Sequence, residues 1–174
     1  MSDQKSILKS TILQYGLIYG GISVAFAIML FVMKMHTEEN SISSLVSALI
    51  LAGSITAGQI AFRKLNNGYL NLSEAMKIGL GVTVIGLLIG ILYFWFQSTI
   101  LDPNSIDKLM DIEINKAIDQ FPEITDEQIA AVSRSLEWWF SPIPLTAMML
   151  AFGLIIGSII SLVTGLIVKK SRPN

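Results

Sequence analysis

Four long apolar stretches alternate with polar segments along the chain and predict four membrane-spanning helices. The clearest is residues 78–101, which contains no charged residue and is bounded by Lys77 and Asp102. At 1.5 Å per residue, a helix of this length is about 36 Å long, enough to cross a hydrocarbon core of about 30 Å with some tilt. The other predicted spans are residues 11–33, 42–62 and 145–168.

A different pattern separates the third and fourth spans. Apolar residues recur at steps of three and four and predict an amphipathic helix over residues 103–121, with Asp102 as its N-cap and Pro103 in its first turn. Thr125 and Gln128 have the spacing of a capping box and predict the start of a second helix. The two helices together are predicted to form a hairpin over residues 103–140.

Aromatic and proline residues mark the end of that second helix. Residues 138–140 read Trp-Trp-Phe, and rings of this kind favour the membrane–water interface. Pro142 and Pro144 are expected to interrupt the chain before the fourth span. In the loop before the third span, Ser73 is the expected N-cap, with Glu74 in the first helical turn.

Composition places the chain among integral membrane proteins. It has 52% hydrophobic and 14% charged residues, and its mean hydropathy is +0.63, whereas soluble domains carry about 25% charged residues. The predicted fold is an all-α four-helix bundle, a single transmembrane domain over residues 1–174. The first apolar stretch continues past residues 25–27, Ala-Phe-Ala, which have the small-x-small form of a cleavage site, so we interpret it as an uncleaved helix rather than a signal peptide.

The distribution of charge predicts the orientation in the membrane. Four spans put both termini on one side, and this side collects eight of the twelve basic residues, at positions 5, 9, 63, 64, 77, 169, 170 and 172. The other side carries eleven of the thirteen acidic residues. Because basic residues near span ends stay in the cytoplasm, both termini are predicted to be cytoplasmic and the hairpin extracytoplasmic.

Small residues repeat every fourth position within the spans. The pattern is clearest in the fourth span and recurs in the third; the residues are Gly153, Gly157, Ser161 and Gly165, then Gly86 and Gly90. Small residues at this spacing let helix backbones approach closely. They are therefore predicted helix-packing positions, either between the four helices of one chain or, along the fourth span, between two copies.

Polar chemistry inside the spans is sparse. No Asp, Glu, Lys or Arg lies in the middle of a predicted span, although transporters and pumps usually place ionisable groups there. Ser54 and Gln59 in the second span are the candidates for a polar pathway; for Gln59 the alternative is a hydrogen bond between helices. The acidic hairpin is interpreted as a solvated face, with binding of a divalent cation as the alternative.

The inventory of catalytic residues predicts that the protein is not an enzyme. There is no cysteine, and His36 is the single histidine. No nucleophile-elbow, zinc-protease or phosphate-loop motif occurs. We expect no cofactor, no resident metal and no nucleic-acid partner.

The order of these features resembles a known family. The chain has a first span containing Gly and Tyr, a loop reading GYLNLSEAMKIG at residues 68–79, Tyr93 and Phe94 near the end of the third span, and ILDP at residues 100–103. It is similar to small bacterial membrane proteins, typical of Bacteroidota, catalogued as domain of unknown function family forty-one ninety-nine. The resemblance implies four helices in a bacterial inner membrane and supplies no activity, ligand or catalytic residue.

Two functions follow as hypotheses. The first is a non-enzymatic membrane protein that acts by helix–helix association, with itself or as an accessory of a membrane complex. The second is a small oligomeric transporter or channel-like protein whose pathway uses the polar residues of the second span.

Overall fold

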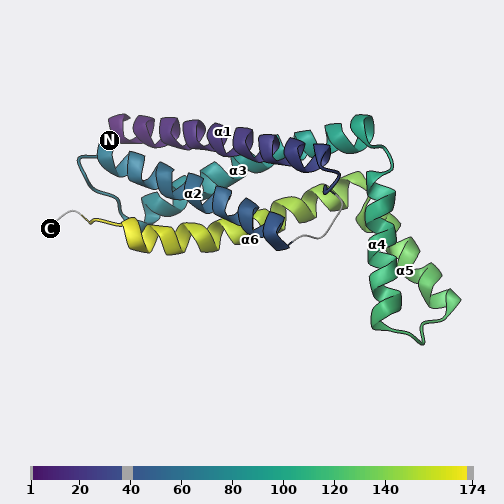
Figure 1. Cartoon of the computed structure of the whole chain (residues 1–174). Coiled ribbons are helices and arrows are strands. Elements are labelled where there is room, and N and C mark those ends of the chain that lie inside the picture. The colour runs from purple at the N-terminus through teal and green to yellow at the C-terminus, as the bar shows by residue number, and fades with distance from the viewer. Residues whose placement is uncertain (1, 37–40, 172–174) are drawn as a thin grey trace. The chain divides into compact units, whose positions relative to one another are not determined.

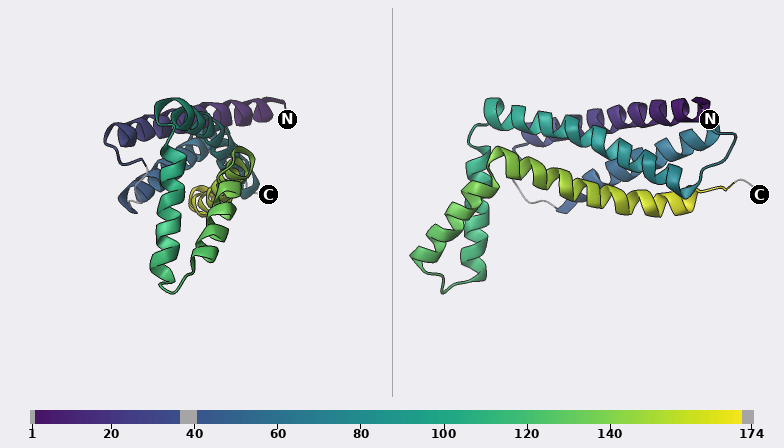
Figure 2. Two further views of the ribbon diagram at one scale, coloured as in Figure 1. Left: turned by 90° about the vertical axis from the view of Figure 1, so that its right-hand side faces the viewer. Right: turned by 180° about the vertical axis from the view of Figure 1, so that it is seen from behind.

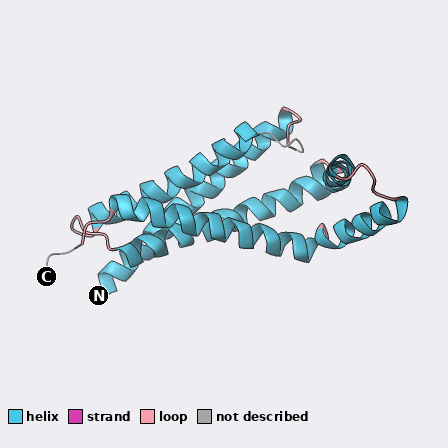
Figure 3. Cartoon of the chain, turned by 90° about the horizontal axis from the view of Figure 1, so that it is seen from below, coloured by secondary structure: helices cyan, strands magenta, loops and turns pink. Residues whose placement is uncertain are grey.

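The computed structural model describes residues 2–36 and 41–171, with the side chains of residues 2 and 3 left out. Within these residues the chain forms six α-helices and one π-helical segment, and no β-strand (Figure 3). The α-helices are α1 (Ser2–Val32), α2 (Ser41–Leu65), α3 (Leu72–Phe96), α4 (Ser105–Gln120), α5 (Asp126–Trp139) and α6 (Pro142–Val168). The π-helical segment η1 (Gln97–Leu101) continues α3 without a break.

Four of these helices are long and apolar enough to cross a membrane. They cover Gln4–Val32, Ser41–Leu65, Leu72–Leu101 and Pro142–Val168. Each contains one predicted span, apart from the last residue of the first, and all four extend beyond it. The fold is therefore all-helical, with the length and composition of a multi-pass membrane protein.

The chain divides into two compact units. The first contains residues 1–91 and 150–174, and the second contains residues 92–149. In the first unit α1, α2, α3 and α6 lie side by side, and α1 begins at the end where α6 finishes (Figures 1 and 2). In the second unit α4 and α5 lie side by side, joined by residues 121–125 (Figure 2).

Helix α3 contacts the other three spanning helices of the first unit. Its buried face includes Ala75, Ile78 and Val82, which share a core cluster with Ile55 and Phe62 of α2. The same cluster includes Val168 at the end of α6 and is flanked by Ile12, Tyr15 and Tyr19 of α1. The core thus lies around α3, while many of the remaining large apolar side chains face outward, as expected for a surface in contact with lipid.

Two predicted helix starts are wrong in detail. Helix α3 is capped by Asn71, not by Ser73, because the Glu74 N–H donates to Asn71 Oδ1 while Glu74 Oε2 accepts from the Asn71 N–H, each at 2.8 Å. Helix α4 begins at Ser105, and the Asp102 carboxylate instead pairs with Lys108 Nζ at 2.8 Å.

The predicted interruption before the fourth span lies at residues 140–141, and the two prolines belong to α6. Pro142 is the first residue of the helix and Pro144 lies within its first turn. Proline is tolerated there because the first N–H groups of a helix have no partner within the helix. The predicted capping box at Thr125 and Gln128 is confirmed, with both reciprocal hydrogen bonds present.

Candidate functional site

The small-residue row of α6, formed by Gly153, Gly157, Ser161 and Gly165, lies against α3. A Cβ atom built on Gly153 or Gly157 would lie within 2.6 Å of Leu87 or Thr83, and one on Gly165 would lie 2.9 Å from the Ala75 Cβ. Ser161 itself fills the space beside Gly79. The partners 87, 83, 79 and 75 also step by four, so the two helices run antiparallel in register. A second copy would have to displace α3 to use this face.

The two glycines singled out in α3 differ in their surroundings. Gly86 lies against the ring of Tyr19, so a Cβ atom at Gly86 would overlap that ring. Gly90 has open space where its Cβ atom would be, with nothing within 4 Å. Close approach between helices therefore requires glycine at Gly86 and not at Gly90.

Gln59 lies at the centre of a buried polar contact that joins three helices. Its side chain is 0% exposed. Gln59 Nε2 donates to the Ala75 carbonyl of α3 at 3.3 Å and to the Ser161 carbonyl of α6 at 3.2 Å. The Ser161 hydroxyl donates to the same Ala75 carbonyl at 3.1 Å. Gln59 Oε1 is buried without a partner among the described residues.

Ser54 lies in the same helix, one and a half turns before Gln59, and does not share its contacts. Its hydroxyl donates to the Ile50 carbonyl at 2.8 Å, within α2 itself. Ser54 is 7% exposed. The two residues predicted as a polar pathway are thus both buried, and neither lines either of the two cavities described below.

A cavity of about 350 Å³ lies among the spanning helices instead. All four helices contribute to it, and its polar lining consists of hydroxyl groups from Tyr19, Ser44, Ser47 and Thr83. The remaining lining is apolar or small: Ala48, Leu51, Leu87, Gly153 and Ile156. The hydroxyls of Ser47 and Thr83 donate to carbonyls of their own helices, so they offer the cavity acceptor oxygens.

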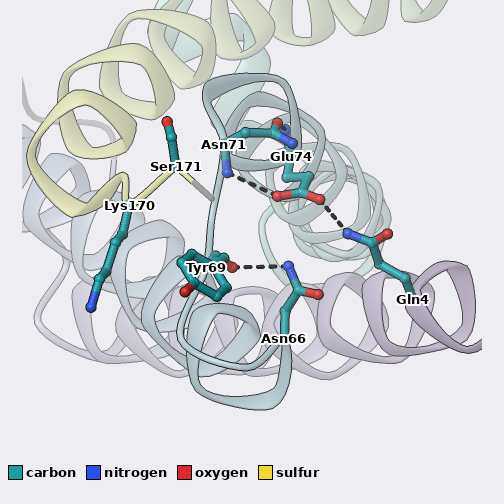
Figure 4. Close-up of a pocket in the computed structure, with 7 residues that line it drawn as sticks. All are labelled: Gln4, Asn66, Tyr69, Asn71, Glu74, Lys170 and Ser171. Atoms are coloured by element: carbon teal, nitrogen blue, oxygen red, sulfur yellow. Dashed lines mark hydrogen bonds between the residues drawn. The ribbon is translucent and has the colours of Figure 1, made fainter. Parts of the chain in front are cut away.

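A second, more polar cavity lies at the end of the first unit where α1 begins and α6 finishes. We call it the end pocket; it measures about 280 Å³ and is lined by Gln4, Asn66, Tyr69, Asn71, Glu74, Lys170 and Ser171 (Figure 4). The residues come from the start of α1, the α2–α3 connection, the first turn of α3 and the segment after α6. None of these residues was selected from the sequence as a binding residue.

Several hydrogen bonds hold the end pocket together. Glu74 accepts from the Asn71 N–H and from Gln4 Nε2, and Asn66 Nδ2 donates to the Tyr69 carbonyl at 2.9 Å (Figure 4). Leu70 and Lys170 exchange two backbone hydrogen bonds at 2.9 Å, which fixes the segment after α6 against the loop before α3. These backbone contacts give no signal in the sequence.

One further contact closes this end of the bundle. Arg63 Nη1, in the last turn of α2, donates to the Val168 carbonyl at 2.9 Å. The guanidinium group therefore caps the C-terminus of α6, where the helix dipole favours a positive charge.

In the second unit the side-chain contacts are mainly local. Trp95 Nε1 donates to Thr146 Oγ1 at 3.0 Å, and Trp138 and Trp139 stack edge to face with ring centroids 4.8 Å apart. Among the described residues, no group of three or more His, Asp or Glu side chains is placed to hold a metal ion. Cation binding by the acidic residues of α4 and α5 therefore stays a prediction from the sequence.

Comparison with known proteins gives one match. A family profile described as "Protein of unknown function (DUF4199)" matches residues 14–170. No curated protein and no solved structure matches the chain. Since the matched region covers most of the chain, including all of α2 to α6, the protein belongs to the DUF4199 family of proteins of unknown function.

Proposed function

We propose that the protein is a non-enzymatic multi-pass protein of a bacterial inner membrane that acts by association with another membrane component or with a second copy. Both termini are proposed to face the cytoplasm, with α4 and α5 forming an extracytoplasmic hairpin. The distribution of basic and acidic residues supports this orientation.

The observation that carries the proposal is the exposure of α4 and α5. Of the thirty residues in the two helices, Ser105 alone is buried. Phe121 between the helices and Trp138 near the end of α5 are 64% and 60% exposed. Exposed aromatic groups next to acidic residues form a surface that the second unit does not cover, and aromatic residues are enriched where proteins associate.

Two features support a non-catalytic role. The single histidine and the absence of cysteine leave few groups for acid–base or nucleophilic chemistry. The polar side chains inside the first unit also have a packing role, because Gln59 and Ser161 hydrogen-bond to carbonyls of neighbouring helices. Such groups hold helices together in a membrane without taking part in a reaction.

Photo-crosslinking of the full chain in its native membrane tests the proposal. A photoreactive residue at Phe121 or Trp138 should give a discrete protein adduct, whereas the same group at Leu92, an outward-facing apolar position of α3, should react with lipid. Native mass spectrometry in mild detergent should retain the same partner or a dimer. A strict monomer without any adduct from α4 or α5 would refute association.

A transporter or channel-like protein is the second candidate, and the cavity among the spanning helices favours it. All four helices contribute to that cavity, and its hydroxyl groups provide polar contacts within an apolar wall. Ser47→Leu should narrow the cavity and reduce flux in reconstituted vesicles. Ser54→Leu and Gln59→Leu test the pathway expected from sequence. Flux that is unaffected by all three changes would remove this candidate.

A further inference from the structure

A groove with a partly apolar wall lies at the turn between α4 and α5 (Figure 2). We call it the tip groove; it has a volume of about 360 Å³ and is lined by Phe121, Glu123, Ile124 and Gln128. Phe121 is 64% exposed, so its ring is open to an approaching molecule. Small-ligand sites measure about 300–1,000 Å³, and the tip groove therefore has room for a large apolar side chain of a partner.

Hydrogen bonds within the turn hold the tip groove in shape. The Phe121 N–H donates to the Ala117 carbonyl at 3.0 Å, and the Ile124 N–H donates to the Phe121 carbonyl at 2.9 Å. The side chain of Gln128 is fixed by the capping box of α5, because its Oε1 accepts from the Thr125 N–H at 2.9 Å. A partner therefore meets a surface that is already formed, and little ordering is needed on binding.

The charged side chains around the tip groove are all negative. Residues 117–133 contain no basic residue and four acidic ones, all exposed: Asp119, Glu123, Asp126 and Glu127. None of these four forms a salt bridge with another described residue. Lys116, the last lysine before them, pairs with Glu113 at 2.9 Å. The negative charge of the turn is thus left for a partner to complement.

Three simpler occupants do not suit this surface. Among the described residues no three His, Asp or Glu side chains are grouped to hold a metal ion, so the carboxylates are spread out and suit several separate cations. An anionic lipid surface would be repelled by the same carboxylates. A second copy in a symmetric dimer would bring two acidic turns together. A polypeptide with several positive charges fits better than any of these.

We propose that the tip groove binds a basic segment of a partner protein, in which one large apolar side chain is flanked by Lys or Arg residues. The apolar side chain would pack against Phe121 and Ile124, and the flanking cations would pair with Glu123 and the neighbouring carboxylates. This inference rests on the association proposed above and adds the chemistry of the partner.

Binding of a synthetic peptide to the full chain in a mild, uncharged detergent tests the inference. The fluorescent probe is Lys-Lys-Leu-Lys-Lys, and the two control peptides replace either its lysines by glutamate or its leucine by serine. Fluorescence anisotropy should show that the probe binds several-fold more tightly than either control. Its affinity should fall as salt is added, because salt screens exposed charges. Equal binding of the probe and the glutamate peptide, or no binding of the probe, would overturn the proposal.

Matched variants locate the binding at the tip groove. Glu123→Gln should weaken binding of the probe about two- to five-fold, as for loss of an exposed ion pair, and Phe121→Ser about five- to ten-fold through loss of apolar contact. Glu137→Gln changes an exposed carboxylate of α5 outside the groove and should have no effect. All three side chains are exposed, so the hairpin should stay folded, which hydrogen exchange in residues 126–130 checks. Equal losses in Glu123→Gln and Glu137→Gln would overturn the proposal, because binding would then follow the general charge of the hairpin.

Two further results separate this inference from the association itself. A crosslinked protein at Phe121 in the native membrane, together with equal binding of the probe and the glutamate peptide, would leave the association standing and overturn the basic partner alone. A dimer that is lost in Phe121→Ser, without binding of the probe, would assign the groove to a second copy and would also overturn the basic partner.

Discussion

The close contact between α3 and α6 at Gly79 and Ser161 has a stability effect that can be measured directly. A Cβ atom built on Gly79 would overlap both Oγ and Cβ of Ser161. Gly79→Ala must therefore separate the helices or force Ser161 to move, and overpacking of this kind costs about 1–3 kcal/mol. Gly90→Ala is the matched control in the same helix, because the corresponding Cβ atom would meet nothing within 4 Å.

The comparison of the two alanine variants isolates the steric effect. Alanine is favoured over glycine in helices by about 1 kcal/mol at either position, so this gain cancels in the difference. Equilibrium unfolding in mixed micelles should find Gly79→Ala less stable than Gly90→Ala by about 1–3 kcal/mol. The double variant Gly79→Ala with Ser161→Gly should recover part of the loss, because the overlapping atoms are removed. Equal stability of the two alanine variants, or no coupling in the double variant, would refute the packing described.

Three further predictions concern single contacts. Arg63→Gln should destabilise the bundle by about 1 kcal/mol, because the cap on the Val168 carbonyl is lost. The control Lys64→Gln changes an exposed neighbour and should leave the free energy of unfolding unchanged. Unfolding in mixed micelles measures both variants, and equal effects would contradict the capping role. Thr125→Ala should destabilise α5 by about 1 kcal/mol through loss of the capping box. Amide hydrogen exchange in residues 126–130 should become faster in this variant and stay unchanged in the control Ser133→Ala. Equal protection of these residues in both variants would contradict the capping role of Thr125. Gln59→Leu should lower the free energy of unfolding by no more than about 1–2 kcal/mol. The lost hydrogen bonds between helices are weak in membranes, and the Oε1 atom, which has no partner among the described residues, is removed with them. The same unfolding assay measures this variant, and complete loss of folding would contradict the prediction.

The spanning helices and one helix start could be predicted because their signals are local. Residues 78–101 contain no charged residue, and Thr125 and Gln128 have the spacing of a capping box. The choice of cap was harder where candidates compete. Asn71 and Ser73 both precede α3, and the reciprocal bond with Glu74 three residues later decides for Asn71. Asp102 was misassigned because Lys108 offers its carboxylate an ion pair instead.

The sites could not be predicted, because their partners lie far apart in sequence or on the backbone. Gln59 bonds to two carbonyl groups, and every residue has a carbonyl, so its partners leave no trace in the pattern of side chains. The end pocket brings Gln4, Glu74 and Lys170 together through a backbone pair between Leu70 and Lys170. That contact depends on the arrangement of all four spanning helices.

Labelling of single cysteines by a membrane-impermeant maleimide tests the central claim most directly. The chain contains no cysteine, so Lys64→Cys and Glu123→Cys each introduce a single, exposed target. In intact spheroplasts the cysteine at position 123 should react at once, and the cysteine at position 64 should react only after the membrane is opened. Reaction of position 64 in intact spheroplasts, or protection of position 123, would contradict four spans with both termini in the cytoplasm.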